Sequence, residues 1–203
     1  MILAFDTSSA ACTAAFFDDE GECLARADEV IGRGHAERLV PMIAELMGGR
    51  VASHILVGVG PGSFTGIRVA IAAAHGLAIG WGAELAGLSS LALLAAGPQA
   101  KGQVAAAVNG GHGELFVQQF DAGTLQPTSE LINAPPAEAA RLTSAELVVG
   151  SGAPKLVGAR GWGEARELFP SAADALRLPG QLRNFPAKPV YARAPDARVP
   201  EAA

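Results

Sequence analysis

One stretch organises this chain of 203 residues: Ile55-Leu-Val-Gly-Val-Gly-Pro-Gly-Ser-Phe-Thr-Gly-Ile-Arg-Val-Ala-Ile-Ala-Ala-Ala-His-Gly-Leu-Ala-Ile-Gly80. Its first part is apolar and β-branched, which is typical of a buried strand. Its middle is rich in glycine around one proline, which predicts a sharp turn because glycine tolerates positive φ and proline fixes its own φ. Its last part, over 67–80, has the composition of a helix. The stretch therefore predicts a strand, a tight turn and a helix.

A turn of this kind can direct backbone N–H groups and a helix N-terminus toward an anion. The candidates for such an anion site are Gly60, Gly62, Ser63, Thr65 and Gly66. Three known motifs do not match the turn, namely the P-loop, the dinucleotide fingerprint and the nucleophile elbow. The two outer glycines are one residue too far apart for a P-loop, and no lysine follows them. We therefore interpret the turn first as part of an assembly surface and second as an anion site.

The helix over 67–80 is apolar or small on nearly every side. Its polar residues Arg68 and His75 share one side, and Ala72, Gly76 and Gly80 recur at every fourth position. A helix with so little polar surface must be covered on more than one side. The sheet covers one side, and either a neighbouring helix or a partner chain covers another. The sequence leaves internal packing and a partner interface as equal alternatives.

A second amphipathic helix is expected over 36–47, ending at Gly48-Gly49. We predict that it shares the partner interface with the helix over 67–80. Its apolar positions are Ala36, Leu39, Val40, Ile43, Leu46 and Met47. Pro41 lies among them, so the helix is expected to start late or to kink.

The remaining pattern predicts two halves, 1–98 and 99–203. The first half opens with three strands over 2–5, 11–17 and 22–30, and ends with a strand over 84–88 and a short helix capped by Ser89. The second half opens with a hairpin over 104–108 and 114–120, followed by a helix over 137–142 and a strand over 147–149. The segment 179–200 is rich in proline and arginine and shows little periodicity, so no long helix is expected there, and no short-period repeat is visible.

Composition argues against several classes of protein. The net charge of -5 disfavours strong direct binding of nucleic acid, which requires a basic face. Two cysteines form no disulfide framework, no secretory signal opens the chain, and the apolar run 69–79 is too short for a bilayer. No pair of histidines has the spacing of zinc ligands. We expect a cytoplasmic protein without membrane contact, metal or cofactor.

Asp6 ends the first strand, where a carboxylate can lie near a metal or a phosphate. An aspartate before Thr-Ser-Ser can equally cap its own turn by accepting hydrogen bonds from the following backbone. We favour the turn-capping role and keep the ligand role as the alternative.

Four blocks of the chain resemble the bacterial tRNA threonylcarbamoyladenosine biosynthesis family TsaB. The most specific is Val57-Gly-Val-Gly-Pro-Gly-Ser-Phe-Thr-Gly-Ile-Arg68. The others, in the family's order, are Ile2-Leu-Ala-Phe-Asp-Thr-Ser8, His35-Ala-Glu-Arg-Leu-Val-Pro41 and Pro189-Val-Tyr-Ala-Arg193. The chain departs from the family at Asn109-Gly-Gly111, where the family has Asp-Ala-Arg, and in a short region between Pro170 and Pro189.

The resemblance implies an α/β fold of the actin/Hsp70-like (ASKHA, ribonuclease H-like) class, with two related halves. It also implies a non-catalytic scaffold that binds the transferase TsaD and forms a nucleotide-dependent ternary complex with the ATPase TsaE. The two apolar helices in addition predict a homodimer when the chain is alone, because such a helix pair tends toward a two-fold interface. tRNA would then be reached only through TsaD. The alternatives are a degenerate ASKHA nucleotide-binding enzyme, a glycoprotease-like peptidase, or a direct tRNA binder that uses Arg183, Lys188, Arg193 and Arg198.

Overall fold

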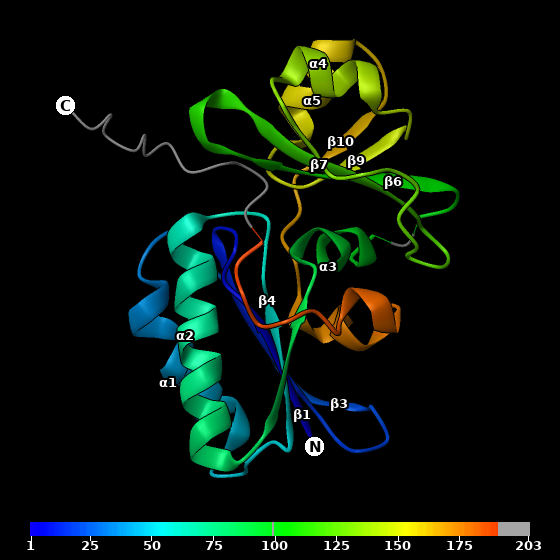
Figure 1. Cartoon of the computed structure of the whole chain (residues 1–203). Helices are drawn as coiled ribbons and strands as arrows, with labels where there is room; N and C mark the ends of the chain where they lie inside the picture. The colour runs from blue at the N-terminus through cyan, green and yellow to red at the C-terminus, as the bar shows by residue number, and fades with distance from the viewer. Residues whose placement is uncertain (99, 191–203) are drawn as a thin grey trace, which may run out of the picture.

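The computed structural model describes residues 1–98 and 100–190, which form two halves stacked on each other (Figure 1). The first half is built on a five-stranded sheet of order β3-β2-β1-β4-β5. Its strands are β1 Ile2–Asp6, β2 Ala11–Phe17, β3 Cys23–Val30, β4 His54–Gly58 and β5 Glu84–Leu88. The central strand β1 runs antiparallel to β2 and parallel to β4, and β4 runs parallel to β5.

The second half repeats this plan around β6 Gln103–Asn109. β6 pairs antiparallel with β7 Leu115–Asp121, which pairs antiparallel with β8 Ile132–Ala134. On its other side β6 pairs parallel with β9 Leu147–Val149, which pairs parallel with β10 Glu164–Arg166. Each strand of one sheet thus has a counterpart in the other, which confirms the predicted α/β fold of two related halves. The repeat is structural, and the two half-sequences do not display it.

The helices form layers on these sheets (Figure 1). α1 His35–Met47 and α2 Phe64–Trp81 cover one face of the first sheet, and α3 Ser90–Ala96 lies on its other face, between the two sheets. α4 Pro136–Leu142 and α5 Ala153–Arg160 cover the outer face of the second sheet. Three short 3-10 segments complete the described chain: η1 Gly111–Gly113, η2 Ala172–Arg177 and η3 Gly180–Leu182.

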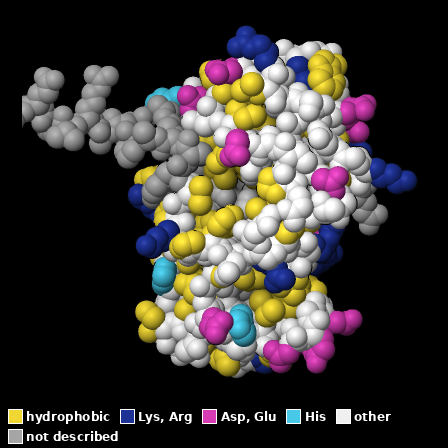
Figure 2. All heavy atoms as spheres, turned by 45° about the vertical axis from the view of Figure 1, so that its right-hand side comes forward, with side chains coloured by type: hydrophobic (Ala, Val, Ile, Leu, Met, Phe, Trp, Pro, Cys, Tyr) yellow, Lys and Arg dark blue, Asp and Glu magenta, His cyan; other side chains and the backbone are white. Residues whose placement is uncertain are grey.

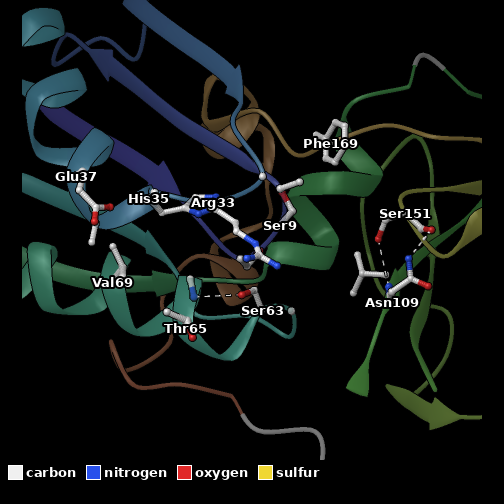
Figure 3. A pocket seen from close by; sticks show the side chains of 18 residues that line it. Ser9, Arg33, His35, Glu37, Ser63, Thr65, Val69, Asn109, Ser151 and Phe169 are labelled. Atoms are coloured by element: carbon white, nitrogen blue, oxygen red, sulfur yellow. Dashed lines mark hydrogen bonds between the residues drawn. The ribbon is translucent and has the colours of Figure 1, made fainter. Parts of the chain in front are cut away.

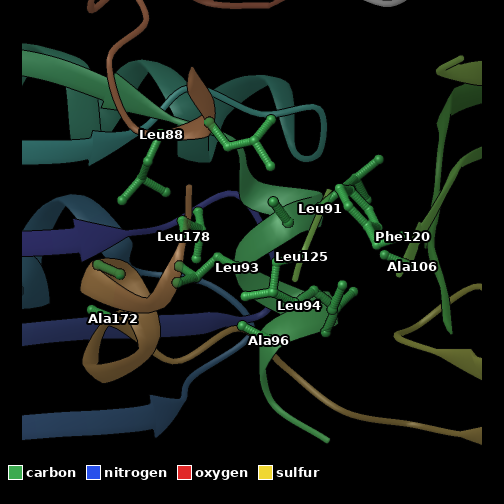
Figure 4. Packing of buried hydrophobic residues seen from close by; sticks show 14 of the residues in the cluster. Leu88, Leu91, Leu93, Leu94, Ala96, Ala106, Phe120, Leu125, Ala172 and Leu178 are labelled. Carbon is green, nitrogen blue, oxygen red and sulfur yellow. The ribbon is translucent and has the colours of Figure 1, made fainter. Parts of the chain in front are cut away.

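α3 is the centre of the core that joins the halves (Figure 4). All of its residues are buried, because β1 and β2 lie on one side of it and β6 and β7 on the other. Its first turn is closed by Ser89, whose side chain accepts a hydrogen bond from the backbone N–H of Ala92 at 3.2 Å. This cap was predicted from the sequence.

After the second sheet the chain returns to the first half. The backbone N–H of Ala172 donates to the hydroxyl of Thr13 at 2.7 Å, and Phe185 pairs with Gly87 at the edge of β5. Further on, the N–H of Val190 donates to the carbonyl of Val59 at 2.9 Å. The predicted division at 98/99 separates the two sheets, while the chain from 171 to 190 packs with the first one.

Two helices begin earlier in the chain than one reading of the sequence expected. α1 begins at His35 and contains Pro41, so of the two expected outcomes, a late start or a kink, the late start is wrong. The exposed proline is tolerated because the opposite face of α1 packs on the sheet through Leu39, Met42, Ile43 and Met47. α2 begins at Phe64, three residues earlier than predicted, because Ser63 caps it.

Within the described part of the chain, α2 is the one helix with the length and composition to cross a membrane. It has 18 residues and a mean hydropathy of 1.3, so the prediction that its apolar run is too short is wrong. Core helices pass the same test of length and hydropathy, and α2 packs on the sheet through Ile67, Ala70, Ile71 and Ala74.

Charged side chains of both signs are interspersed on the face drawn in Figure 2. Lys and Arg side chains do not gather there into one basic patch. This face therefore lacks the electrostatic footprint of a nucleic-acid-binding surface.

Candidate functional site

The glycine-rich loop between β4 and α2 packs directly against the turn after β1. A Cβ atom on Gly66 would lie 1.8 Å from the carbonyl oxygen of Thr7, and one on Gly62 would lie 2.3 Å from the carbonyl oxygen of Ser8. Gly60 has a φ of +98°, which disfavours any side chain. The close approach of two backbone segments therefore explains these glycines without a ligand.

Hydrogen bonds fix the loop in this position. The N–H of Ser63 donates to the carbonyl of Ser8 at 2.6 Å, and the hydroxyl of Thr7 donates to the carbonyl of Gly66 at 2.6 Å. The N–H of Gly60 donates to the hydroxyl of Ser90 at 3.1 Å. The side chain of Ser63 accepts from the N–H of Gly66 and caps α2. Three of the loop's amides are thus satisfied within the protein.

Asp6 is fully buried where the turn, the loop and α3 meet. Its Oδ1 accepts from the N–H and the hydroxyl of Ser8, both at 2.7 Å, and its Oδ2 accepts from the hydroxyl of Ser90 at 2.5 Å. Burial raises the pKa of Asp6 above its ordinary value of 3.8, and the hydrogen bonds from Ser90 and Ser8 oppose this shift. The predicted turn-capping role is confirmed, and the tie to Ser90 is a contact that the sequence did not reveal.

A cleft of about 670 Å³ opens between the two halves beside the loop (Figure 3). From the first half it is lined by the β1–β2 turn and by the first turns of α1 and α2. From the second half it is lined by Asn109 and Ser151, which are joined by two hydrogen bonds. The backbone N–H of Asn109 donates to the hydroxyl of Ser151, and the side-chain amide of Asn109 donates to the carbonyl of Ser151. Four of the predicted anion-site residues line this cleft, namely Gly62, Ser63, Thr65 and Gly66, whereas Gly60 does not.

The sequence reasoning missed Arg33 and His35, which also line the cleft. Arg33 lies between Gly32 and Gly34, whose φ values of +69° and +87° make the turn that leads into α1. The Gly-Arg-Gly pattern before an amphipathic helix is the signal that could have identified this turn. The described residues contain no group of His, Cys, Asp or Glu side chains placed to hold a metal ion.

The exposed face of α2 carries five of the eleven residues that were predicted to form an interface. Arg68, Ala72, His75, Gly76 and Gly80 are all exposed. The guanidinium of Arg68 stacks on the ring of Phe64, 3.6 Å from its centroid. The sequence reasoning missed Phe64 and Ile79, which are 56% and 84% exposed. Ile79 follows Ala72 and His75 at helical spacing, so a full helical projection would have included it.

α1 does not present all the residues predicted for that interface. Leu39, Ile43 and Met47 are buried in the core against the first sheet, so they cannot form an exposed contact surface. The amphipathic period identified the correct face, but that face is turned toward the protein's own sheet. Of the remaining predicted positions, Ala36 and Val40 are exposed and Leu46 is half-buried.

Comparisons with known proteins agree with this architecture. The family model described as TsaD, tRNA N6-adenosine threonylcarbamoyltransferase, matches residues 28–152. A crystal structure from Pseudomonas aeruginosa, described as an uncharacterized protein with similarity to peptidase YEAZ, is 31% identical, with a TM-score of 0.80 over 95% of this chain and 99% of that one. The YeaZ structure from the same organism is 30% identical, with a TM-score of 0.78 over 94% and 98% of the two chains.

Two curated relatives bear the name tRNA threonylcarbamoyladenosine biosynthesis protein TsaB. The Escherichia coli protein is 35% identical over 127 residues, which are 59% of this chain and 54% of that protein. The Haemophilus influenzae protein is 37% identical over 99 residues, 46% of this chain and 41% of that protein. The chain thus spans about half the length of the curated relatives it matches. Taken together, these likenesses make the chain a member of the TsaD family and a relative of the TsaB and YeaZ proteins.

Proposed function

We propose that this protein is a non-catalytic scaffold subunit in the synthesis of tRNA threonylcarbamoyladenosine, and that it binds the transferase TsaD through the exposed face of α2. The observation that carries the proposal is this face itself. Ile79 and Phe64 expose large apolar side chains beside the small residues Ala72, Gly76 and Gly80. Exposed apolar side chains of this size on one helix favour an interaction site there.

The helix glycines support a close external contact. Among the described residues, and apart from the helix's own neighbouring backbone, no atom lies within 4 Å of a Cβ built on Gly76 or on Gly80, so packing within this part of the chain requires neither glycine. Each destabilises the helix by about 1 kcal/mol relative to alanine. An approaching partner helix would use the space that these missing side chains leave. The loop glycines differ, because the protein's own backbone fills the space beside them.

The cleft supports a scaffold rather than an enzyme. Asp6, the carboxylate at the end of the central strand, is occupied by hydrogen bonds from Ser8 and Ser90. We propose that catalysis lies in TsaD, that TsaE joins as a third, nucleotide-dependent subunit, and that tRNA is reached through TsaD in the cytoplasm. In the absence of partners, the same α2 face would join two copies into a homodimer.

Co-purification tests the interface. Ile79→Glu introduces a charge on the α2 face, near the C-terminal end of the helix, and should weaken TsaD binding at least about tenfold, as expected for an anchor residue. Leu142→Glu is the matched control, because Leu142 is 55% exposed on α4 of the other half. Size-exclusion chromatography of the same variants tests the homodimer. Retention of TsaD by a folded Ile79→Glu variant would place the interface elsewhere.

Titration calorimetry with ATP and magnesium distinguishes the scaffold from a nucleotide-binding enzyme. The scaffold predicts no turnover by the isolated chain, and hydrolysis would contradict it. A gel-shift with tRNA, with and without TsaD, tests direct tRNA binding. Of the tail cations considered for that role, Arg193 and Arg198 lie outside the described residues, and the guanidinium of Arg183 donates to the carbonyl of Leu178 at 3.0 Å.

A further inference from the structure

We propose that the edge strand β3 is an interaction surface of this protein, and that it pairs antiparallel with β3 of a second copy of the chain. The proposal concerns the edge of the first sheet and not the α2 face, so it does not rest on the scaffold function. β3 is the outermost strand of its sheet, and among the described residues β2 is its one strand neighbour (Figure 1). The outer backbone N–H and C=O groups of β3 can therefore accept another strand.

β3 has few of the features that normally keep an edge strand from pairing. Protected edges are commonly short or carry proline or lysine. β3 has eight residues and contains neither proline nor lysine. Its pairing with β2 shifts register opposite Phe16 and Phe17, which affects its first residues, and the pairing is regular from Ala25 to Val30. Most of the strand is thus straight enough to form a new ladder.

The side chains of β3 are self-complementary in one register. When Ala27 lies opposite its own copy across a two-fold axis, Arg26 of each copy lies opposite Asp28 of the other. The same register places Leu24, which is 46% exposed, opposite Val30, which is 64% exposed. Opposite charges and apolar side chains that face each other across antiparallel strands stabilise the pair. The exposed residues of β3 therefore match those of a second β3.

Other registers are less favourable. An axis at Arg26 or at Asp28 places that charge opposite its own copy, and like charges at this distance repel each other. An axis between Ala27 and Asp28 places Arg26 opposite Glu29, but Glu29 is already bound by Arg38 of α1 through two hydrogen bonds. The order of the charges therefore favours the register centred on Ala27.

The side chains of Arg26 and Asp28 are placed for this pairing. They share one face of β3, because they lie opposite Ala15 and Thr13, which are alternate residues of β2. The hydroxyl of Thr13 donates to Oδ1 of Asp28, and the hydroxyl of Ser171 donates to Oδ2 at 3.0 Å. Neither Arg26 nor Asp28 forms an ion pair within the described part of the chain. The carboxylate is thus held in position while its charge remains available to a guanidinium.

Pairing through β3 leaves the α2 face of both copies open. α2 packs on β4 and β5, whereas β3 lies at the opposite edge of the same sheet. The two surfaces can therefore be occupied at the same time, and each can be blocked without the other.

Sedimentation velocity of the full chain tests the pairing in an Ile79→Glu background, in which a charge blocks the α2 face. The expected result is a dimer that grows with protein concentration. Arg26→Asp and Asp28→Arg should each weaken it at least about tenfold, because like charges then oppose each other. An equimolar mixture of the two variants should restore the dimer, since opposite charges face each other again. Arg141→Asp is the control, because Arg141 is an exposed arginine of α4.

Disulfide cross-linking tests the register without changing a charge. In a Cys23→Ser background, Ala27→Cys places the two introduced thiols opposite each other, within the Cα separation that a disulfide spans. Ala25→Cys is the matched control, since Ala25 is half-buried like Ala27. In the proposed register its two copies lie about 13 Å apart along the strands. Mild oxidation should link the Ala27→Cys chains and leave the Ala25→Cys chains separate.

Circular dichroism verifies the fold of each variant. A monomeric Ile79→Glu chain overturns the proposal, because association would then depend on the α2 face. Failure of the folded charge variants to dimerise when mixed also overturns it. So does a folded Ala27→Cys chain that forms no cross-link, or one that cross-links no better than Ala25→Cys.

Discussion

Gly58 lies so close to Asp6 that a Cβ atom on residue 58 would stand 1.8 Å from the carboxylate Oδ2. Gly58 ends β4 and Asp6 ends β1, its parallel neighbour. The pair therefore fixes the spacing between the first turn and the glycine loop. Any side chain at residue 58 would push the carboxylate away from Ser90, its partner on the other side.

We predict that Gly58→Ala destabilises the protein by about 1 to 3 kcal/mol, the usual effect of overpacking a buried position. Chemical denaturation at neutral pH measures the change. Gly48→Ala is the comparison outside the loop, since Gly48 has open space around it but a φ of +54°. A Gly58→Ala variant as stable as the unmodified chain would show that the carboxylate can move without loss.

Gly76→Ala should have two effects of opposite sign. It should stabilise the isolated chain by up to about 1 kcal/mol, because alanine is the better helix former and its methyl group would meet no atom of another described segment within 4 Å. It should weaken binding to TsaD, because the methyl group occupies the space proposed for the partner. Thermal denaturation and a binding titration measure the two effects separately. A gain in both stability and affinity would argue against close helix contact at Gly76.

Leu39→Glu and Val40→Glu should differ sharply although the residues are adjacent. Leu39 is fully buried, so a glutamate there should prevent folding, whereas Val40 is 49% exposed and should tolerate it. Expression yield and circular dichroism distinguish the two outcomes. Only the Val40 variant is then informative about partner binding by α1. A folded Leu39→Glu protein would contradict the packing of α1 described above.

The pH dependence of stability should contain a contribution from Asp6. Burial raises the pKa of Asp6 in the folded state above its unfolded value, so the folded state holds the proton more tightly. This contribution to the free energy of unfolding is fully present below the pKa that Asp6 has in the unfolded state. It is lost as the pH rises through the pKa that Asp6 has in the folded state. Asp6→Asn removes it and keeps an acceptor for the N–H of Ser8. Urea denaturation from about pH 4 to about pH 8 should therefore show a smaller decline for Asp6→Asn than for the unmodified chain. Parallel curves would mean that Asp6 is ionised throughout.

The two cysteines should react at very different rates. Cys12 is buried beneath α1, and burial raises its pKa to about 11, whereas Cys23 is exposed on the edge strand β3. At about pH 8, a maleimide should label Cys23 in the native protein and Cys12 only after unfolding. Mass spectrometry counts the labels, and Cys23→Ser identifies them. Fast labelling of both Cys12 and Cys23 in the native chain would indicate that α1 moves away from the sheet.

The sequence predicted the elements of the first half well because strand, turn and helix signals agree there. The capping of α3 by Ser89 and the strand–turn–helix of the glycine loop depend on local chemistry, which sequence patterns record. The hydrophobic period of α1 predicted its apolar face, but a period cannot tell whether that face meets its own sheet or a partner. The steric role of the loop glycines was equally hidden, since Thr7 and Ser8 lie more than fifty residues earlier in the chain.

The cleft was the least predictable part. Arg33 and Ser63 come from different loops, and Ser151 comes from the other half, so only the folded arrangement brings them to one cavity. The structural repeat was hidden for a related reason. The strand order is set by backbone pairing, which many different side chains allow, and the two half-sequences share no visible period.

The return of the chain from the second sheet to β5 also constrains how the protein is made. Domains at the N-terminus usually fold first as the ribosome delivers them. Here the pairing of Gly87 with Phe185 and of Val59 with Val190 cannot form until almost the whole chain has been synthesised. The half that is translated first is therefore completed last, and until then the edge of β5 remains open to other strands in the cell.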